Sequence, residues 1–234
     1  MNLFYVPGLP DCIELPEEEA KHCIQVLRVQ SGDTIQLTDG QGNFYHAVII
    51  QAHPKHCRFE VIATIPTPLP WNYRLQVDMA PTKNMERTEW FVEKATEIGI
   101  NTIRFIQCQH SERKEIKTAR LEKVAIAAMK QTLKASFPSI REIQPFQLSI
   151  QQPFDGQQLI AHCHADINRV ELSRIYRKGG NAHVLIGPEG DFSREEIDAA
   201  LDAGWQSISL GPCRLRTETA ALAACQTIHV INSL

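Results

Sequence analysis

From about residue 74 onward, short apolar runs alternate with longer segments in which apolar residues recur every three or four positions. Short apolar runs bounded by turn residues are typical of strands, and the wider spacing is typical of helices. The expected strands lie at 74–79, 102–107, 159–163, 182–186 and 207–210, and the expected helices lie near 87–98, 119–133, 194–203 and 217–231. Strands that alternate with helices form a parallel sheet covered on both faces, so this part predicts an α/β fold.

The residues before this region have a different pattern, with short strand-like segments around turns and a single helical segment. The expected strands lie at 3–6, 34–37, 44–51 and 57–65, and the expected helix lies near 17–28. Three prolines follow at Pro66, Pro68 and Pro70, and proline cannot join a central strand because it lacks the N–H group. We therefore expect a small β-barrel domain at 1–70 and the α/β domain at 71–234.

Two similar loops follow strands near the C-terminus. The segments L-I-G-P-E-G-D-F-S (185–193) and L-G-P-C-R-L-R-T-E-T-A (210–220) each run from an apolar strand through Gly-Pro into a helix. Ser193 and Glu196 form a capping-box pattern at the start of the first of these helices. Open α/β sheets place ligands beyond the carboxyl ends of their strands, so the two loops together predict one binding site.

Two other chemistries are disfavoured by the sequence. Neither G-x-x-x-x-G-K-[ST] nor G-x-G-x-x-G occurs, so a nucleotide-hydrolysing P-loop and a Rossmann-type cofactor site are not expected. The cluster His162, Cys163, His164 and Asp166 suggests a metal site at first sight. In a strand, however, the two histidines would share one face and the cysteine would point to the other, so we expect no metal site.

Composition and charge bear on the cell compartment and on how the protein could contact RNA. The formal net charge of 234 residues is −3, so any contact with RNA has to come from local basic patches rather than from diffuse positive charge. The seven cysteines include no C-x-x-C pair and are odd in number, which is typical of a reducing compartment. No apolar stretch has the length of a membrane span. We expect a cytoplasmic protein that does not enter a membrane.

Four motifs in order resemble the SPOUT methyltransferases, and within them the RsmE type. They are H-C-I-Q-V-L-R-V-Q-S-G-D (22–33), E-K-A-T-E-I-G (93–99), I-G-P-E-G followed by Phe192-Ser193, and L-R-T-E-T-A (215–220). The sequence departs from the family pattern in two places. Asp191 stands where a second glycine is usual, and Cys213-Arg214 stand where Arg-Ile is usual. Aspartate tolerates a positive φ better than most residues, so the first loop is expected to keep its path.

The resemblance implies a trefoil-knotted α/β methyltransferase domain preceded by a PUA-like RNA-binding barrel. It also implies transfer of a methyl group from S-adenosylmethionine to N3 of a uridine in 16S ribosomal RNA, and an active site completed across a homodimer. Two alternatives stay open: a SPOUT methyltransferase that acts on another RNA, and a catalytically silent RNA-binding protein that kept the fold. Cofactor affinity separates the second of these from the two enzymes.

Candidate site residues follow from the loops and from the resemblance. Glycines would let the backbone approach the cofactor, and leucines would form apolar walls for its adenine. The expected cofactor-binding residues are His164, Leu185, Gly187, Glu189, Gly190, Leu210, Gly211, Leu215 and Thr219. Arg216 is the expected catalytic residue, because a fixed cation stabilises the anion that forms as N3 loses its proton. Its alternative role is a structural ion pair with Glu218 or Glu189, and no residue stands out as the general base.

RNA contacts are expected from basic residues in both domains. The candidates are Arg28, Lys83, Arg87 and Arg113, the last of which begins a basic stretch that runs to Lys123. Basic side chains of this kind are more often simply solvated, and Arg28 could instead pair with Asp33 or Asp39. The expected partner is 16S ribosomal RNA in the assembled small subunit.

Overall fold

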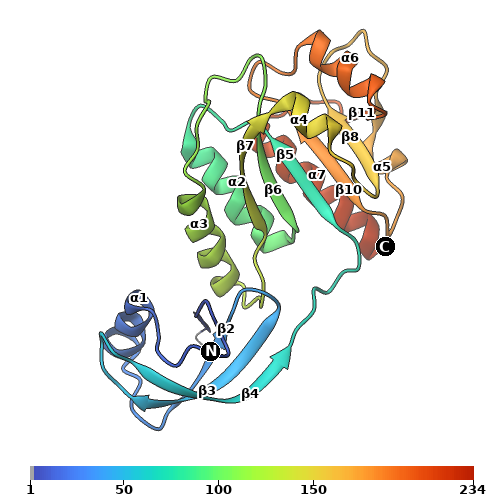
Figure 1. Cartoon of the computed structure of the whole chain (residues 1–234). Helices are drawn as coiled ribbons and strands as arrows, with labels where there is room; N and C mark the ends of the chain where they lie inside the picture. The colour runs from blue at the N-terminus through green and yellow to red at the C-terminus, as the bar shows by residue number, and fades with distance from the viewer. Residues whose placement is uncertain (1–2) are drawn as a thin grey trace. The chain divides into compact units, whose positions relative to one another are not determined.

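The computed structural model describes residues 3–234 and consists of two compact units (Figure 1). The first unit contains the described residues up to Trp71 together with Ile126–Phe137. The second unit contains Asn72–Ala125 and Pro138–Leu234. The sequence predicted two continuous ranges, 1–70 and 71–234, and did not include the return of the chain to the first unit.

The first unit is built on a four-stranded sheet in the order β1-β2-β3-β4. β1 pairs with β2 in parallel, and the other two pairs are antiparallel. The strands are β1 (Leu3–Tyr5), β2 (Thr34–Thr38), β3 (Asn43–Gln51) and β4 (Arg58–Pro66). The single predicted helix is a short α-helix, α1 (Glu17–Lys21), that continues as a wider π-helical turn, η1 (His22–Val26). The strand–helix order therefore agrees with the sequence prediction.

The sheet curls around its own core because the chain before α1 pairs with the beginning of β4. Leu15 N–H donates to Cys57 O at 2.9 Å, and Phe59 N–H donates to Ile13 O at 3.0 Å. In β3 buried side chains alternate with more exposed ones, which is the period of a sheet with one apolar face, and β4 contributes Phe59 to the same core. Phe4, Leu37, Ile49 and Phe59 are among the core residues of this unit.

The segment Ile126–Phe137 completes the first unit. Ala135 O accepts hydrogen bonds from Gly42 N–H at 2.9 Å and from Thr38 Oγ1 at 3.0 Å. The Phe137 ring packs edge-to-face against Tyr5, with 5.8 Å between the ring centroids. A β-carbon on Gly40, whose φ is +74°, would come within 2.6 Å of the Phe137 ring, so this close packing requires glycine.

The second unit contains a seven-stranded sheet in the order β7-β6-β5-β10-β8-β11-β9, with every pair parallel. The strands are β5 (Leu75–Met79), β6 (Thr102–Gln107), β7 (Ser139–Pro145), β8 (Gln157–Ala161), β9 (Val170–Glu171), β10 (Ala182–Ile186) and β11 (Gln206–Ser209). The α/β prediction with a parallel sheet is therefore confirmed. The trefoil knot stays a prediction.

Helices cover the sheet. They are α2 (Met85–Ile98), α3 (Thr118–Gln131), α4 (Phe146–Gln151), α5 (Leu172–Ile175), α6 (Arg194–Asp202) and α7 (Thr217–Ser233). α7 packs against α2 and lies on β5 and β10, whereas α4 and α6 contact each other and share a buried apolar cluster with Leu185 of β10 (Figure 1). β7, α4, β9 and α5 were not predicted from the sequence. Among the described residues, no helix has the length and apolar character needed to cross a membrane.

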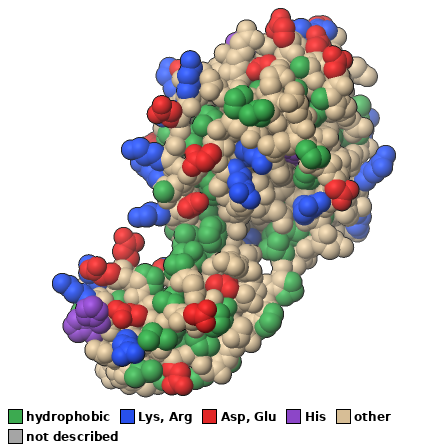
Figure 2. Space-filling view, viewed as in Figure 1, with side chains coloured by type: hydrophobic (Ala, Val, Ile, Leu, Met, Phe, Trp, Pro, Cys, Tyr) green, Lys and Arg blue, Asp and Glu red, His purple; other side chains and the backbone are tan. Residues whose placement is uncertain are grey.

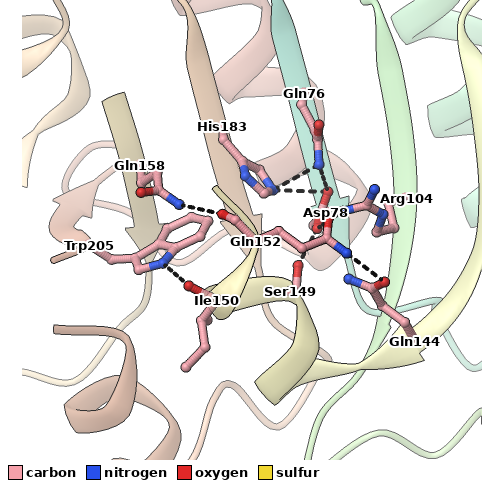
Figure 3. A network of polar contacts seen from close by, with 10 residues as sticks. All are labelled: Gln76, Asp78, Arg104, Gln144, Ser149, Ile150, Gln152, Gln158, His183 and Trp205. Carbon is pink, nitrogen blue, oxygen red and sulfur yellow. Dashed lines mark hydrogen bonds and ion pairs between the residues drawn. The ribbon is translucent and has the colours of Figure 1, made fainter. Parts of the chain in front are cut away.

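A polar network is buried between the sheet and α4 (Figure 3). Asp78 on β5 lies 3.0 Å from His183 Nε2 on β10, and Ser149 of α4 and Gln76 also donate to the Asp78 carboxylate. Burial would raise the pKa of Asp78, but the hydrogen bond and charge of His183, helped by Ser149 and Gln76, lower it below its ordinary value. Asp78 and His183 are 0% and 1% exposed, so this network supports the sheet rather than meeting a substrate.

Candidate functional site

A cavity of about 760 Å³ lies at the carboxyl ends of β8, β10 and β11. Its walls are the ends of these strands, the 187–191 loop, the 210–216 loop and the first turn of α7. We call it the loop cavity. Its position agrees with the rule that parallel α/β sheets bind ligands beyond the carboxyl ends of their strands. The two loops singled out in the sequence therefore do form one site.

The first loop is held in shape by Asp191, which has a φ of +66° as its position in the motif suggested. One oxygen of its carboxylate accepts from Phe192 N–H at 2.8 Å, and the other accepts from Cys163 N–H at 2.7 Å. A β-carbon on Gly187 would lie 3.1 Å from Phe192 N, so the loop folds tightly on itself. Asp191 thus joins the first loop to the segment after β8.

The residues after β8 do not continue the strand, because β8 ends at Ala161. His162 Nε2 lies 2.7 Å from Ser207 Oγ, and His164 Nε2 lies 2.9 Å from Phe192 O. Burial lowers the pKa of His162 to about 4, so its imidazole is neutral at neutral pH. Within residues 3–234, no group of three or more His, Cys, Asp or Glu side chains could hold a metal ion.

The predicted cofactor residues divide into two groups. Gly187, Glu189, Leu210, Gly211 and Leu215 line the loop cavity, as does the predicted catalytic Arg216. The other four do not line it.

Those four residues have other surroundings. Leu185 is fully buried in the core beneath the strand ends, and His164 contacts the backbone of Phe192. A β-carbon on Gly190 would pack 3.1 Å from His110, and Thr219 lines a second cavity. The apolar wall expected from Leu185 is formed instead by Ile186 and Ile208, because residues one position along a strand point to opposite faces.

Sequence reasoning missed several residues of the loop cavity, including Cys163, Arg169, Glu171 and Ser209. Cys163 and Ser209 carry a weak signal, since each lies at or just beyond the end of a strand. Arg169 and Glu171 belong to the segment around the short edge strand β9, whose two exposed residues show no strand pattern. Arg169 donates to His162 O at 2.6 Å, which brings this segment to the cavity.

A second cavity, of about 710 Å³, lies between the beginnings of α2 and α7. We call it the α2–α7 cavity. It shares Arg214, Leu215 and Arg216 with the loop cavity, so the end of the 210–216 loop forms a wall of both. Arg87, Trp90, Glu218 and Thr219 are among its other residues, with Asn84 and Glu86. Two ligands bound in these cavities would lie on either side of the same three residues.

The side chain of Arg216 is exposed and makes no hydrogen bond or ion pair with any residue of the described chain, although its backbone oxygen accepts from Ala220 N–H at 2.7 Å. The alternative role as an ion pair with Glu218 or Glu189 is therefore not seen. Glu189 instead accepts a hydrogen bond from Lys83 N–H at 2.9 Å. Glu218 Oε1 lies 3.8 Å from Arg87 Nε. The guanidinium of Arg216 is left available to the two cavities that it lines.

Three of the predicted RNA-contact residues, Lys83, Arg87 and Arg113, belong to the second unit, and Arg28 belongs to the first. Lys83 forms an ion pair with Glu112 at 2.8 Å, and Arg113 donates to the backbone oxygens of Thr82 and Lys83. Arg28 is exposed in the first unit with a φ of +58°, and it forms no ion pair with a described residue. On the face drawn in Figure 2, basic and acidic side chains are interspersed. Contact with RNA remains a prediction for these residues.

Comparison with known proteins gives the family. The family model described as an RNA methyltransferase domain matches residues 69–229, and the model described as an RNA methyltransferase PUA domain matches residues 15–62. A Ribosomal RNA small subunit methyltransferase E from Mycobacterium bovis is 28% identical, over 99% of this chain and 92% of its own length.

Solved structures agree. A probable rRNA-methyltransferase from Porphyromonas gingivalis has a TM-score of 0.95 and 47% identity, covering 100% of this chain and 99% of that one. A Ribosomal RNA small subunit methyltransferase E from Neisseria gonorrhoeae, bound to S-adenosyl methionine, has a TM-score of 0.85 and 26% identity, covering 98% and 97%. With a family model covering more than half of its length, the chain belongs to the RNA methyltransferase family.

Proposed function

We propose that this protein transfers a methyl group from S-adenosylmethionine to N3 of a uridine in the 16S RNA of the small ribosomal subunit. The observation that carries the proposal is the pair of cavities that share Arg216. A transferase has to hold a donor and an acceptor side by side, and positioning of this kind supplies much of the acceleration. The relatives named above support ribosomal RNA as the substrate, and the motif resemblance supports uridine N3.

The loop cavity suits the cofactor. Ile186, Leu210 and Leu215 offer apolar walls to an adenine ring, while the backbone groups of the two loops can hydrogen-bond its edge. Glu171 and Glu189 offer carboxylates to the positive charges of the ammonium and sulfonium groups. When bound, S-adenosylmethionine supplies an electrophilic methyl group. The cavity residues hold it and limit the access of water.

Arg216 would act on the acceptor side. Uridine N3 becomes nucleophilic only when the imide loses its proton, and the resulting negative charge spreads over O2, N3 and O4. A guanidinium beside this charge stabilises it through charge-assisted hydrogen bonds. Arg216 has no competing carboxylate partner among the described residues, which supports this role.

The proposal extends to the setting of the reaction: a cytoplasmic homodimer that acts on the assembled small subunit, with Arg28, Lys83, Arg87 and Arg113 as RNA-contact candidates. The support is the resemblance to SPOUT enzymes, whose sites are completed across a dimer. Analytical ultracentrifugation tests the dimer directly. A monomer at micromolar concentration that nevertheless methylates its substrate would contradict this part.

The experiment that tests the reaction uses small ribosomal subunits from a strain that lacks the gene. We expect methyl label from S-adenosylmethionine to enter the 16S RNA, and reverse transcription to stop at one uridine because methylated N3 cannot form a Watson–Crick pair. Label in another RNA would replace the substrate proposed here. Absence of both methyl transfer and cofactor binding in calorimetry would point to a silent RNA-binding protein.

A further inference from the structure

Glu218 is a buried carboxylate whose hydrogen-bonding capacity is not filled by the described chain. It is the second residue of α7, it is 6% exposed, and it lines the α2–α7 cavity. Its Oε2 has no hydrogen-bond partner within residues 3–234. Its Oε1 lies 3.8 Å from Arg87 Nε, which is beyond hydrogen-bond distance. Buried acceptors are nearly always satisfied, so this one calls for a donor from outside the chain.

Two structural roles explain the charge of Glu218 but not its free acceptor. A carboxylate in the first turn of a helix is favoured by the helix dipole, and a guanidinium nearby offsets part of the cost of burial. Neither interaction gives Oε2 a hydrogen bond. An exposed carboxylate would serve the dipole equally well, as Glu195 does at the second position of α6. The burial of Glu218 beside a cavity is therefore the feature that needs a ligand.

The polar groups that line the α2–α7 cavity are of the types that complement the imide edge of uracil. The imide edge of uracil presents an acceptor, the N3–H donor and a second acceptor, O4, N3–H and O2. The cavity presents one buried acid, Glu218, together with three arginines as donors, Arg87, Arg214 and Arg216. Its other acid, Glu86, is exposed. Cytosine has no proton on N3, so the carboxylate would have none to remove there, and no anion would form beside the arginines.

The cavity also contains an aromatic surface. Trp90 on α2 is 41% exposed and lies three residues after Arg87, so both project from the same face of the helix. Proteins that take a single base out of an RNA stack commonly receive it on an aromatic ring. An exposed tryptophan beside a buried carboxylate and three arginines suits a planar, uncharged base with an acidic N–H.

We propose that the α2–α7 cavity receives the target uracil and that Glu218 accepts the proton of N3; this inference rests on the function proposed above. In the step, the N3–H bond breaks, its electron pair stays on N3, and the proton forms a bond to Oε2 of the carboxylate. Arg216 stabilises the resulting anion from the wall shared with the loop cavity. Glu218 thus fills the role of general base that the sequence left without a candidate.

The test compares Glu218→Gln with Glu195→Gln, which removes a carboxylate from the same helical position of α6. At pH 7 we expect Glu218→Gln to slow single-turnover methylation of unmodified small subunits by about 100-fold or more, with cofactor affinity unchanged. The rate of the variant should rise about tenfold per pH unit toward alkaline pH, because ionisation of N3 then replaces the missing base. Wild-type and Glu195→Gln rates should change far less over this range.

A purely structural role gives a different result. If Glu218 only supports α7 or Arg87, the variant loses rate by the same factor at every pH, and the inference is overturned. It is equally overturned if Glu218→Gln stays within twofold of wild type. Binding of S-adenosylmethionine in calorimetry shows whether a variant is folded. If Glu218→Gln does not fold, Glu218→Asp is tested in its place. Because aspartate keeps the carboxylate base, the rate of Glu218→Asp should show no recovery at alkaline pH. Wild-type protein that methylates no uridine N3 would instead refute the proposed function.

Discussion

At the scale of single residues, Arg216 is the side chain whose surroundings most directly suggest chemistry. It lines both cavities and is committed to no partner among the described residues. We expect Arg216→Ala to lower kcat by about 100-fold, because the anion loses a nearby cation, while cofactor affinity changes by about threefold or less. Methylation assays stopped at timed intervals measure kcat, and calorimetry measures the affinity for the cofactor. Equal loss of turnover and of cofactor binding would refute the catalytic role.

The buried imidazole of His162 should make the free energy of unfolding depend on pH in the acid range. Burial lowers its pKa to about 4 from the ordinary 6.5, so the unfolded chain takes up its proton first as the pH falls. The stabilisation from neutral His162 is complete above pH 6.5 and is lost progressively toward pH 4. We expect His162→Gln, which can still bond Ser207 but does not titrate, to lose less free energy of unfolding than wild type between pH 7.5 and 5 in urea titrations. Equal losses would show that other groups cause the acid sensitivity.

At the scale of elements, the start of α6 joins local and distant structure. Ser193 Oγ accepts a hydrogen bond from Glu196 N–H at 3.2 Å, and the Glu196 carboxylate accepts one from Ser193 N–H at 2.9 Å. The second carboxylate oxygen of Glu196 accepts from Gln109 N–H at 2.8 Å, after β6. We expect Ser193→Ala to lower the free energy of unfolding by about 1 kcal/mol. Ser173→Ala, the same substitution at an exposed serine of α5, is the control, and an equal loss there would argue against the cap.

The same scale shows what the sequence can and cannot predict. β6 and β10 coincide with their predicted bounds, because every residue of β10 is buried and the apolar residues of β6, Ile103, Phe105 and Ile106, are buried as well. β7 was missed because it is an edge strand with mostly polar residues, and α4 because it is only six residues long. The loop cavity could be predicted because local motifs mark both of its loops. The α2–α7 cavity could not, since it depends on α2 meeting the start of α7, which no local pattern records.

At the scale of the whole molecule, the first unit is discontinuous in sequence. Its sheet depends on Ala135 as a hydrogen-bond acceptor and on Phe137 for packing against Tyr5. We expect a fragment ending at Trp71 to unfold at a lower temperature than the same fragment joined by a flexible linker to residues 126–137. Thermal melting followed by circular dichroism measures the difference. Identical transitions would mean that the returning segment adds no stability.

The return of residues 126–137 also sets an order of events during protein synthesis. β2 and β3 leave the ribosome early, but their partner Ala135 follows only after β5, α2 and β6 have been made. In the nascent first unit, Gly42 N–H and Thr38 Oγ1 therefore still lack their final acceptor when the next unit begins to emerge from the ribosome. Although each unit has its own core, co-translational folding cannot finish the first before much of the second exists.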